Sequence, residues 1–196
     1  MDKINSKNEF IEIFKTNITR EGADKLLDFL ENGSDFFTAP ASGKRHCAFE
    51  GGLCAHSLNV YKRFKKIIEN EFGNNYLDKI SDESIAIMAL LHDVCKVNTY
   101  TTDYKNQKVN GQWIQVPYYQ YNNSLPYGHG EKSVYIINGY IRLTREEAMA
   151  INWHMAGFDP RAQFGSDLSD AFSKYPIAVL FHTADLTATY IDEKET

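Results

Sequence analysis

The sequence predicts an all-α protein, a helical bundle with one inserted β-hairpin at about residues 97–121. Over most of the chain, apolar side chains recur at the three- and four-residue spacing that gathers them on one face of a helix. The segment 97–127 breaks this pattern, because it is rich in Thr, Tyr, Val and Gln. With 196 residues and 43% hydrophobic content, residues 1–196 are expected to form a single domain with a substantial core.

Three helices are expected in the first part of the chain. Residues 7–16 and 22–31 each place apolar side chains on one helical face, and Gly33 is suited to end the second helix. Residues 1–35 are therefore expected to form an N-terminal helical extension. A longer helix with apolar residues at helical spacing follows at about 52–71.

The next expected helix leads directly to two polar residues. Ser81 can cap its N-terminus, and two acidic residues follow in its first turn, where they are favourable. Residues 85–91 read IAIMALL, which predicts a helix that is buried on most of its surface. This helix is expected to end at His92 and Asp93, two groups that need partners when they are buried.

A hairpin signal lies within the segment that breaks the helical pattern. Residues 107–116 read QKV-NG-QWIQV, and Asn110-Gly111 supplies the positive φ angles that a type I′ turn requires. A hairpin inserted between two site-bearing segments can form the rim or lid of a pocket. A purely structural flap is the equal alternative.

Two further helices are expected in the C-terminal part. Thr144 and Glu147 have the spacing of a capping box, which predicts a helix through residues 148–155. Pro176 suits the first turn of a helix, and residues 176–191 are largely apolar. The last helix is therefore expected to be buried.

Composition and charge argue against several classes of protein. No segment has the continuous apolar length of a membrane span, and the N-terminus lacks the apolar stretch of a secretory signal. The three cysteines show no paired spacing, which favours a reduced, cytoplasmic setting over a disulfide framework. The formal charge of −5 gives no sign of extensive nucleic-acid binding, although a local positive site can still hold a small phosphorylated ligand.

Histidines and aspartates in apolar helical contexts suggest a metal site. His92 and Asp93 cannot share one narrow helical stripe, but both can reach a cation near the end of their helix. His56 and Asp185 lie on helices that are also apolar and would pack against this one. A mixed set of imidazoles and carboxylates suits Mn²⁺, Fe²⁺, Zn²⁺ or similar ions. The alternative is a helical protein with purely structural histidines.

The order His56, His92-Asp93, Asp185 resembles the H…HD…D signature of the HD-domain metal-dependent phosphohydrolases. The stretch FFTAPASGKRHCAFEGGLCAHSLNV, at 36–60, is similar to the start of the HD domain found in some bacterial 3'-5' exoribonucleases. The resemblance covers about residues 36–191. It implies that the helical bundle is of the HD-domain type.

Two more motifs look like those of HD proteins that hold two metals, namely GHGEKSV at 128–134 and WHM at 153–155. HDVCK is similar to the family motif HD-x-G-K, with Cys95 where glycine is common. A single metal, with the two extra histidines contacting phosphate or water, is the conservative alternative. The ligands implied for a first metal are His56, His92, Asp93 and Asp185, and Asp93 would bridge to a second metal held by His129 and His154.

The resemblance also implies roles at the substrate. Lys96 would contact a substrate phosphate, so Asp93 and Lys96 are the implied catalytic residues. His46 and Arg161 are further candidates for substrate binding, although a surface or turn position is the equal alternative for His46. His182 is expected either to face the site or to orient a metal ligand from behind.

The function expected from this resemblance is hydrolysis of a phosphomonoester or phosphodiester, preferably a nucleotide, by a water that one or two divalent ions (Mn, Fe, Zn, Ni or Mg) activate. The alternatives are a nuclease acting on short RNA or DNA and a non-catalytic HD module that binds metal and nucleotide. The oligomeric state is left open.

Overall fold

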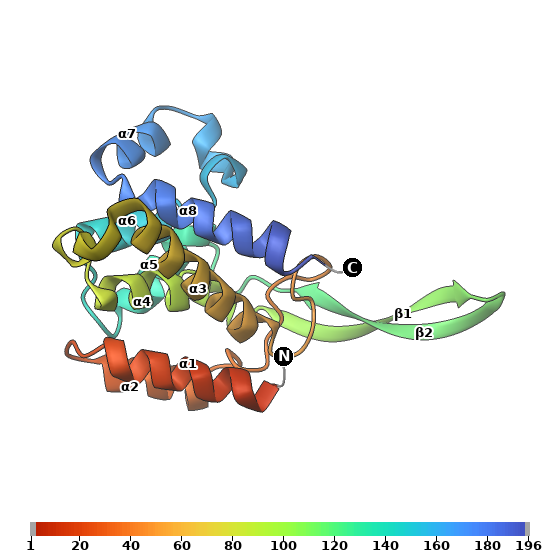
Figure 1. The fold of residues 1–196 in the computed structure, drawn as a ribbon. Helices are drawn as coiled ribbons and strands as arrows, with labels where there is room; N and C mark the ends of the chain where they lie inside the picture. The colour runs from red at the N-terminus through yellow and green to blue at the C-terminus, as the bar shows by residue number, and fades with distance from the viewer. Residues whose placement is uncertain (1–2, 195–196) are drawn as a thin grey trace.

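A computed structural model describes residues 3–194, and the ends of the predicted domain, residues 1–2 and 195–196, lie outside this described part. The described chain forms a helical bundle around one hydrophobic core, with a two-stranded hairpin outside it (Figure 1). Its α-helices are α1 (Lys3–Asn17), α2 (Ala23–Asp28), α3 (Gly52–Phe72), α4 (Asp82–Leu91), α5 (His129–Asn138), α6 (Arg145–Asn152), α7 (Asp167–Lys174) and α8 (Ile177–Thr187). Short 3-10 or π turns lie at Phe29–Gly33, Gly73–Asp78, Val94–Lys96, Ala156–Phe158, Pro160–Gln163 and Ala188–Asp192.

Helix α4 runs through the hydrophobic core. All residues from 85 to 91 are fully buried, as expected for a helix that is apolar all round. The Ser81 hydroxyl accepts a hydrogen bond from the N–H of Ser84 at 3.1 Å, so the predicted cap is confirmed. The regular helix stops directly before His92 and Asp93, as the sequence predicts.

Helix α3 packs against both α4 and α8 (Figure 1). Phe64 of α3 and Phe181 of α8 meet edge to face, with ring centroids 5.0 Å apart. Helix α8 buries only one face, because Val179 and Leu186 are exposed. The expectation of a buried last helix is therefore correct for one face only, and the outer face of α8 meets solvent.

The N-terminal helices share the core of the bundle. Phe10 and Phe14 of α1 and Leu26 of α2 are buried in the same cluster as side chains of α3 and α4. Helix α2 is shorter than predicted, because the chain widens into a π turn before Ser34. Residues 1–35, expected as an extension, thus contribute to the same core through their described part.

An ion-pair network centred on Arg20 joins three parts of the bundle. The guanidinium donates to Glu147 of α6 at 2.9 and 3.0 Å and to Glu83 of α4 at 3.1 Å. Glu147 also accepts from the Ser84 hydroxyl and from the Thr144 N–H, so the predicted capping box is confirmed. Burial raises the pKa of Glu147, but Arg20 and the other donors outweigh burial and hold this pKa below its ordinary value. Helix α6 ends at Asn152, before the predicted boundary.

Helices α5 and α6 approach closely at Gly130. A Cβ at Gly130 would lie 2.2 Å from the carbonyl oxygen of Asn152, so Gly130→Ala is expected to destabilise the protein by about 1–3 kcal/mol. Urea unfolding of the variant measures this loss. Gly157→Ala is the matched control, because its Cβ would meet nothing within 4 Å. An equal effect of the two substitutions would contradict the close approach at Gly130.

The predicted hairpin is confirmed, and it projects away from the bundle (Figure 1). Its strands are β1 (Tyr100–Val109) and β2 (Gln112–Tyr121), which pair in antiparallel orientation. Asn110 and Gly111 have φ angles of 49° and 85°, as a type I′ turn requires. Among the described helices, none has the length and apolar character needed to cross a membrane.

Candidate metal centre

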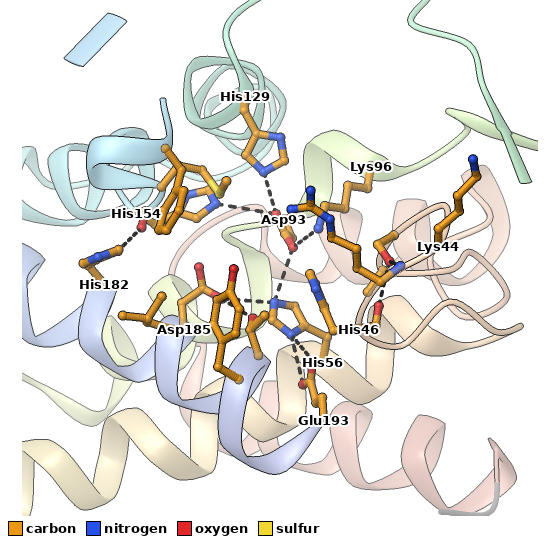
Figure 2. A pocket seen from close by; sticks show the side chains of 18 of the residues that line it. Lys44, His46, His56, Asp93, Lys96, His129, His154, His182, Asp185 and Glu193 are labelled. Atoms are coloured by element: carbon orange, nitrogen blue, oxygen red, sulfur yellow. Dashed lines mark hydrogen bonds and ion pairs between the residues drawn. The ribbon is translucent and has the colours of Figure 1, made fainter. Parts of the chain in front are cut away.

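Side chains from distant parts of the fold converge on Asp93 (Figure 2). The apolar helices bring them together, because each side chain stands on or just beyond a helix that packs in the same core. Asp93 itself is 2% exposed, so its charge is removed from bulk water. The converging groups are His56 from α3, His92 from the end of α4, His129 from the start of α5, His154 from the turn after α6, and Asp185 from α8.

A first set of ligand atoms has the spacing of a shared cation. Nε2 of His56 lies 3.3 Å from Nε2 of His92 and 3.3 Å from Oδ1 of Asp185. Oδ2 of Asp93 lies 3.5 Å from each of the two imidazole nitrogens. Atoms bound to one ion at about 2.0–2.2 Å are separated by about 3.0–3.5 Å. The four separations fall in this range, and the ligand atoms of His56, His92 and Asp185 lie close enough together to hold one divalent ion.

The two imidazoles of this set differ in their hydrogen-bond partners and in their pKa values. His92 donates from Nδ1 to the Ala89 carbonyl at 3.0 Å, which leaves a lone pair on Nε2. Burial lowers the pKa of His92 to about 3, so its ring is neutral, the form that binds metals. Burial also lowers the pKa of His56, but Asp185 and Glu193 outweigh burial and raise it to about 10. A cation at Nε2 of His56 would replace the proton that these carboxylates favour.

A second set of ligand atoms lies on the other oxygen of Asp93. Oδ1 lies 2.8 Å from Nε2 of His129 and 3.6 Å from Nε2 of His154. His154 donates from Nδ1 to the Ile151 carbonyl at 2.6 Å, so its Nε2 carries a lone pair. This Nε2 is buried and has no hydrogen-bond partner. A buried acceptor without a partner is rare, and a cation shared with Asp93 would satisfy it.

Lys96 neutralises part of the charge at Asp93. Its Nζ donates to Oδ2 of Asp93 at 2.6 Å. Burial raises the pKa of Asp93, but Lys96 and His92 outweigh burial and hold it well below its ordinary value. Burial also lowers the pKa of Lys96, but Asp93 more than compensates, so the pKa of Lys96 is raised and its ammonium stays charged.

The centre opens into a cavity of about 640 Å³. Its walls carry apolar and cationic side chains as well as the candidate ligands, the carboxylate of Glu193 and the hydroxyl groups of Ser42 and Thr189. The apolar wall includes Met155, Phe158 and Leu186, and the cations are Lys44, Arg45, Lys96 and Lys194.

The other site residues predicted from the sequence lie in different places relative to the cavity. His46 lines the cavity with its ring 4.9 Å from that of His56, and burial lowers its pKa to about 4. His182 donates to the His154 carbonyl at 2.6 Å, so it contacts the backbone of this candidate ligand. The structure does not bring Arg161 to this cavity; its guanidinium pairs with Asp159 at 2.6 Å and with Glu131 at 2.7 Å.

Two residues beside the centre were not predicted from the sequence. Glu193 lies 3.0 Å from Nδ1 of His56, although the charged run in which it stands, DEKE at 192–195, is typical of a solvated surface. Cys95, to which the sequence assigns no role in the site, has its Sγ 3.4 Å from Nδ1 of His129. The only sequence feature that distinguishes Cys95 is its position in HDVCK. This stretch resembles the motif HD-x-G-K, which commonly has glycine at that position.

Comparisons with known proteins identify no relative of this chain. No protein-family model, curated protein or solved structure matches this chain. The chemistry of the centre is therefore inferred from its own residues.

Proposed function

We propose that the protein is a metal-dependent phosphohydrolase that cleaves a phosphomonoester or phosphodiester, with nucleotides as the preferred substrates. The observation that carries this proposal is the shared carboxylate, because Asp93 turns one oxygen to each of two sets of imidazole donors. Two adjacent cation sites beside an ammonium group would suit the negative charge of a phosphoryl group. The order of these residues also resembles that of the HD-domain phosphohydrolases.

Divalent ions bound at Asp93 would neutralise phosphoryl charge and lower the pKa of an attacking water. The protein's own groups would orient the substrate. Lys96 has three N–H donors, so it can hold Asp93 and a phosphate oxygen together. His46 is neutral at pH 7, since burial and the nearby His56 and Lys96 lower its pKa, and it can donate or accept a hydrogen bond toward the substrate.

The size and walls of the cavity favour a nucleotide. A volume of about 640 Å³ lies within the range of about 300–1,000 Å³ that small-molecule sites occupy. Met155, Phe158 and Leu186 offer apolar contact to a base or sugar. Lys44 and Arg45 add positive charge to the cavity wall of a protein whose net charge is −5.

A test of the proposal begins with elemental analysis of protein purified without chelator. The protein is then assayed with Mn²⁺, Fe²⁺, Zn²⁺, Ni²⁺ and Mg²⁺ against p-nitrophenyl phosphate, bis-p-nitrophenyl phosphate, nucleoside monophosphates and short RNA. Metal-dependent release of phosphate or p-nitrophenol supports the proposal. Cleavage confined to RNA would favour the nuclease alternative. Tight nucleotide binding without turnover would favour a non-catalytic module, and failure to bind any of the ions would contradict the proposal.

Lys96→Met is expected to lower kcat/KM by about 10–100-fold, because it removes a charge-assisted hydrogen bond to the substrate phosphate. Metal affinity should be kept or increased, because a cation next to Asp93 is removed. Steady-state kinetics and calorimetric metal titration measure the two quantities. Lys66→Met, on the exposed side of α3, is the control. Unchanged kcat/KM in the Lys96 variant would exclude a phosphate contact.

A further inference from the structure

Glu193 contacts His56 on the ring nitrogen that faces away from the candidate metal. Both carboxylate oxygens lie 3.0 Å from Nδ1, while Nε2 points at Asp93 and Asp185 (Figure 2). The side chains of His56 and Glu193 are 1% and 2% exposed. A buried carboxylate in this position is the natural acceptor for the Nδ1–H of the imidazole.

The carboxylate of Glu193 is itself held in place. Asn59 donates from Nδ2 to Oε1 of Glu193 at 3.0 Å. The preceding residue, Asp192, pairs with the guanidinium of Arg63. Helix α3 carries Asn59 and Arg63 as well as His56. The π turn Ala188–Asp192 and the following Glu193 therefore lie along the helix that carries His56. His56 and Asn59 contact the carboxylate itself, whereas Arg63 contacts only the neighbouring Asp192.

We propose that Glu193 is a positioning residue of the metal centre, an inference that rests on the metal site of the proposed function. Glu193 fixes the Nδ1–H tautomer and the ring orientation of His56, which leaves Nε2 as the metal ligand. Metal-binding histidines commonly donate their second nitrogen to a carboxylate or carbonyl, and losing this partner costs about 10–100-fold in metal affinity. His92 and His154 use backbone carbonyls for this purpose, whereas a carboxylate also strengthens the imidazole as a ligand.

The test is calorimetric titration of the metal-stripped, full-length protein with Mn²⁺ and with Zn²⁺. Glu193→Ala should bind about 10–100-fold more weakly than the wild type. Glu193→Gln should lose less, because its amide oxygen still accepts the Nδ1–H of His56. Asp192→Ala removes the neighbouring carboxylate and its pair with Arg63, and its metal affinity should stay within about twofold of the wild type.

A second readout separates positioning from general loosening of the last turn. Nitrogen-15 NMR of the Zn²⁺-loaded protein should show a protonated Nδ1 on His56 in the wild type and in Glu193→Gln, with slower solvent exchange of this proton than in Glu193→Ala. Wild-type affinity in Glu193→Ala would overturn the inference while leaving the proposed function intact. Equal losses in the Ala, Gln and Asp192 variants would also overturn it, because they would indicate a structural role. Failure of the wild type itself to bind metal would instead remove the metal site of the proposed function.

Discussion

Asp93→Asn is expected to abolish metal binding and phosphoester hydrolysis together. The two oxygens of Asp93 face different imidazole pairs, so one substitution weakens both sets at once. It removes the negative charge that the two sets share and replaces one of the two oxygens by an amide nitrogen, which carries no lone pair for a metal. Asparagine keeps the shape of the side chain, which limits the structural disturbance. We expect metal affinity to fall by at least about 100-fold and kcat/KM by at least about 1,000-fold. Elemental analysis and a phosphate-release assay on the same preparation measure both.

The control for this variant is Asp159→Asn. Asp159 is also buried and charge-paired, to Arg161, but it does not line the cavity. Its substitution should lower stability and leave metal content unchanged. Circular dichroism shows whether each variant is folded. A folded Asp93 variant that is free of metal and fully active would refute the metal-dependent mechanism.

The positions of the main candidate ligands could be predicted because they depend on the helical pattern. The apolar run before His92 predicts a buried helix, and a buried helix must bring its terminal His92-Asp93 pair into the interior. His56 and Asp185 also stand on apolar helices, and such helices pack against one another. The hairpin turn could also be predicted, because the neighbouring residues Asn110 and Gly111 are enough to indicate a type I′ turn.

The remaining features depend on contacts that leave no periodic trace in the sequence. Glu193 reaches His56 only because a π turn carries the chain back along α3. Arg161 was expected at the substrate, but its placement depends on Asp159, two residues earlier, and on Glu131, thirty positions away. The exposure of one face of α8 could not be predicted from composition, because residues 176–191 have apolar side chains on both faces. Long-range pairing and turn geometry, rather than propensity, decide these cases.

Glu147→Gln is expected to cause a large loss of stability outside the candidate metal centre. The Glu147 side chain is 1% exposed and accepts hydrogen bonds from Arg20, Ser84 and Thr144. Glutamine has one acceptor oxygen instead of two, and its amide group would face the Arg20 guanidinium. Breaking a fully buried ion pair costs about 3–5 kcal/mol, and the partial exposure of Arg20 reduces this to about 2–3 kcal/mol. Urea unfolding at pH 7 measures the difference, and the melting temperature should fall by about 5–10 °C.

The pH dependence of the same variant identifies the cause. The pKa of Glu147 is lowered in the folded protein from its ordinary value of 4.5, so the folded state binds this proton less readily than the unfolded state. The stabilisation is therefore complete above about pH 4.5 and is lost as the pH falls through the folded pKa. The stability difference between wild type and Glu147→Gln should be constant from about pH 5.5 to 7 and should shrink below about pH 4.5. Glu146→Gln, on the same helical turn and without an ion-pair partner among the described residues, should change stability by less than about 0.5 kcal/mol. A difference for Glu147→Gln that stays the same size at pH 3 would show that packing, rather than the buried charge, carries the stabilisation.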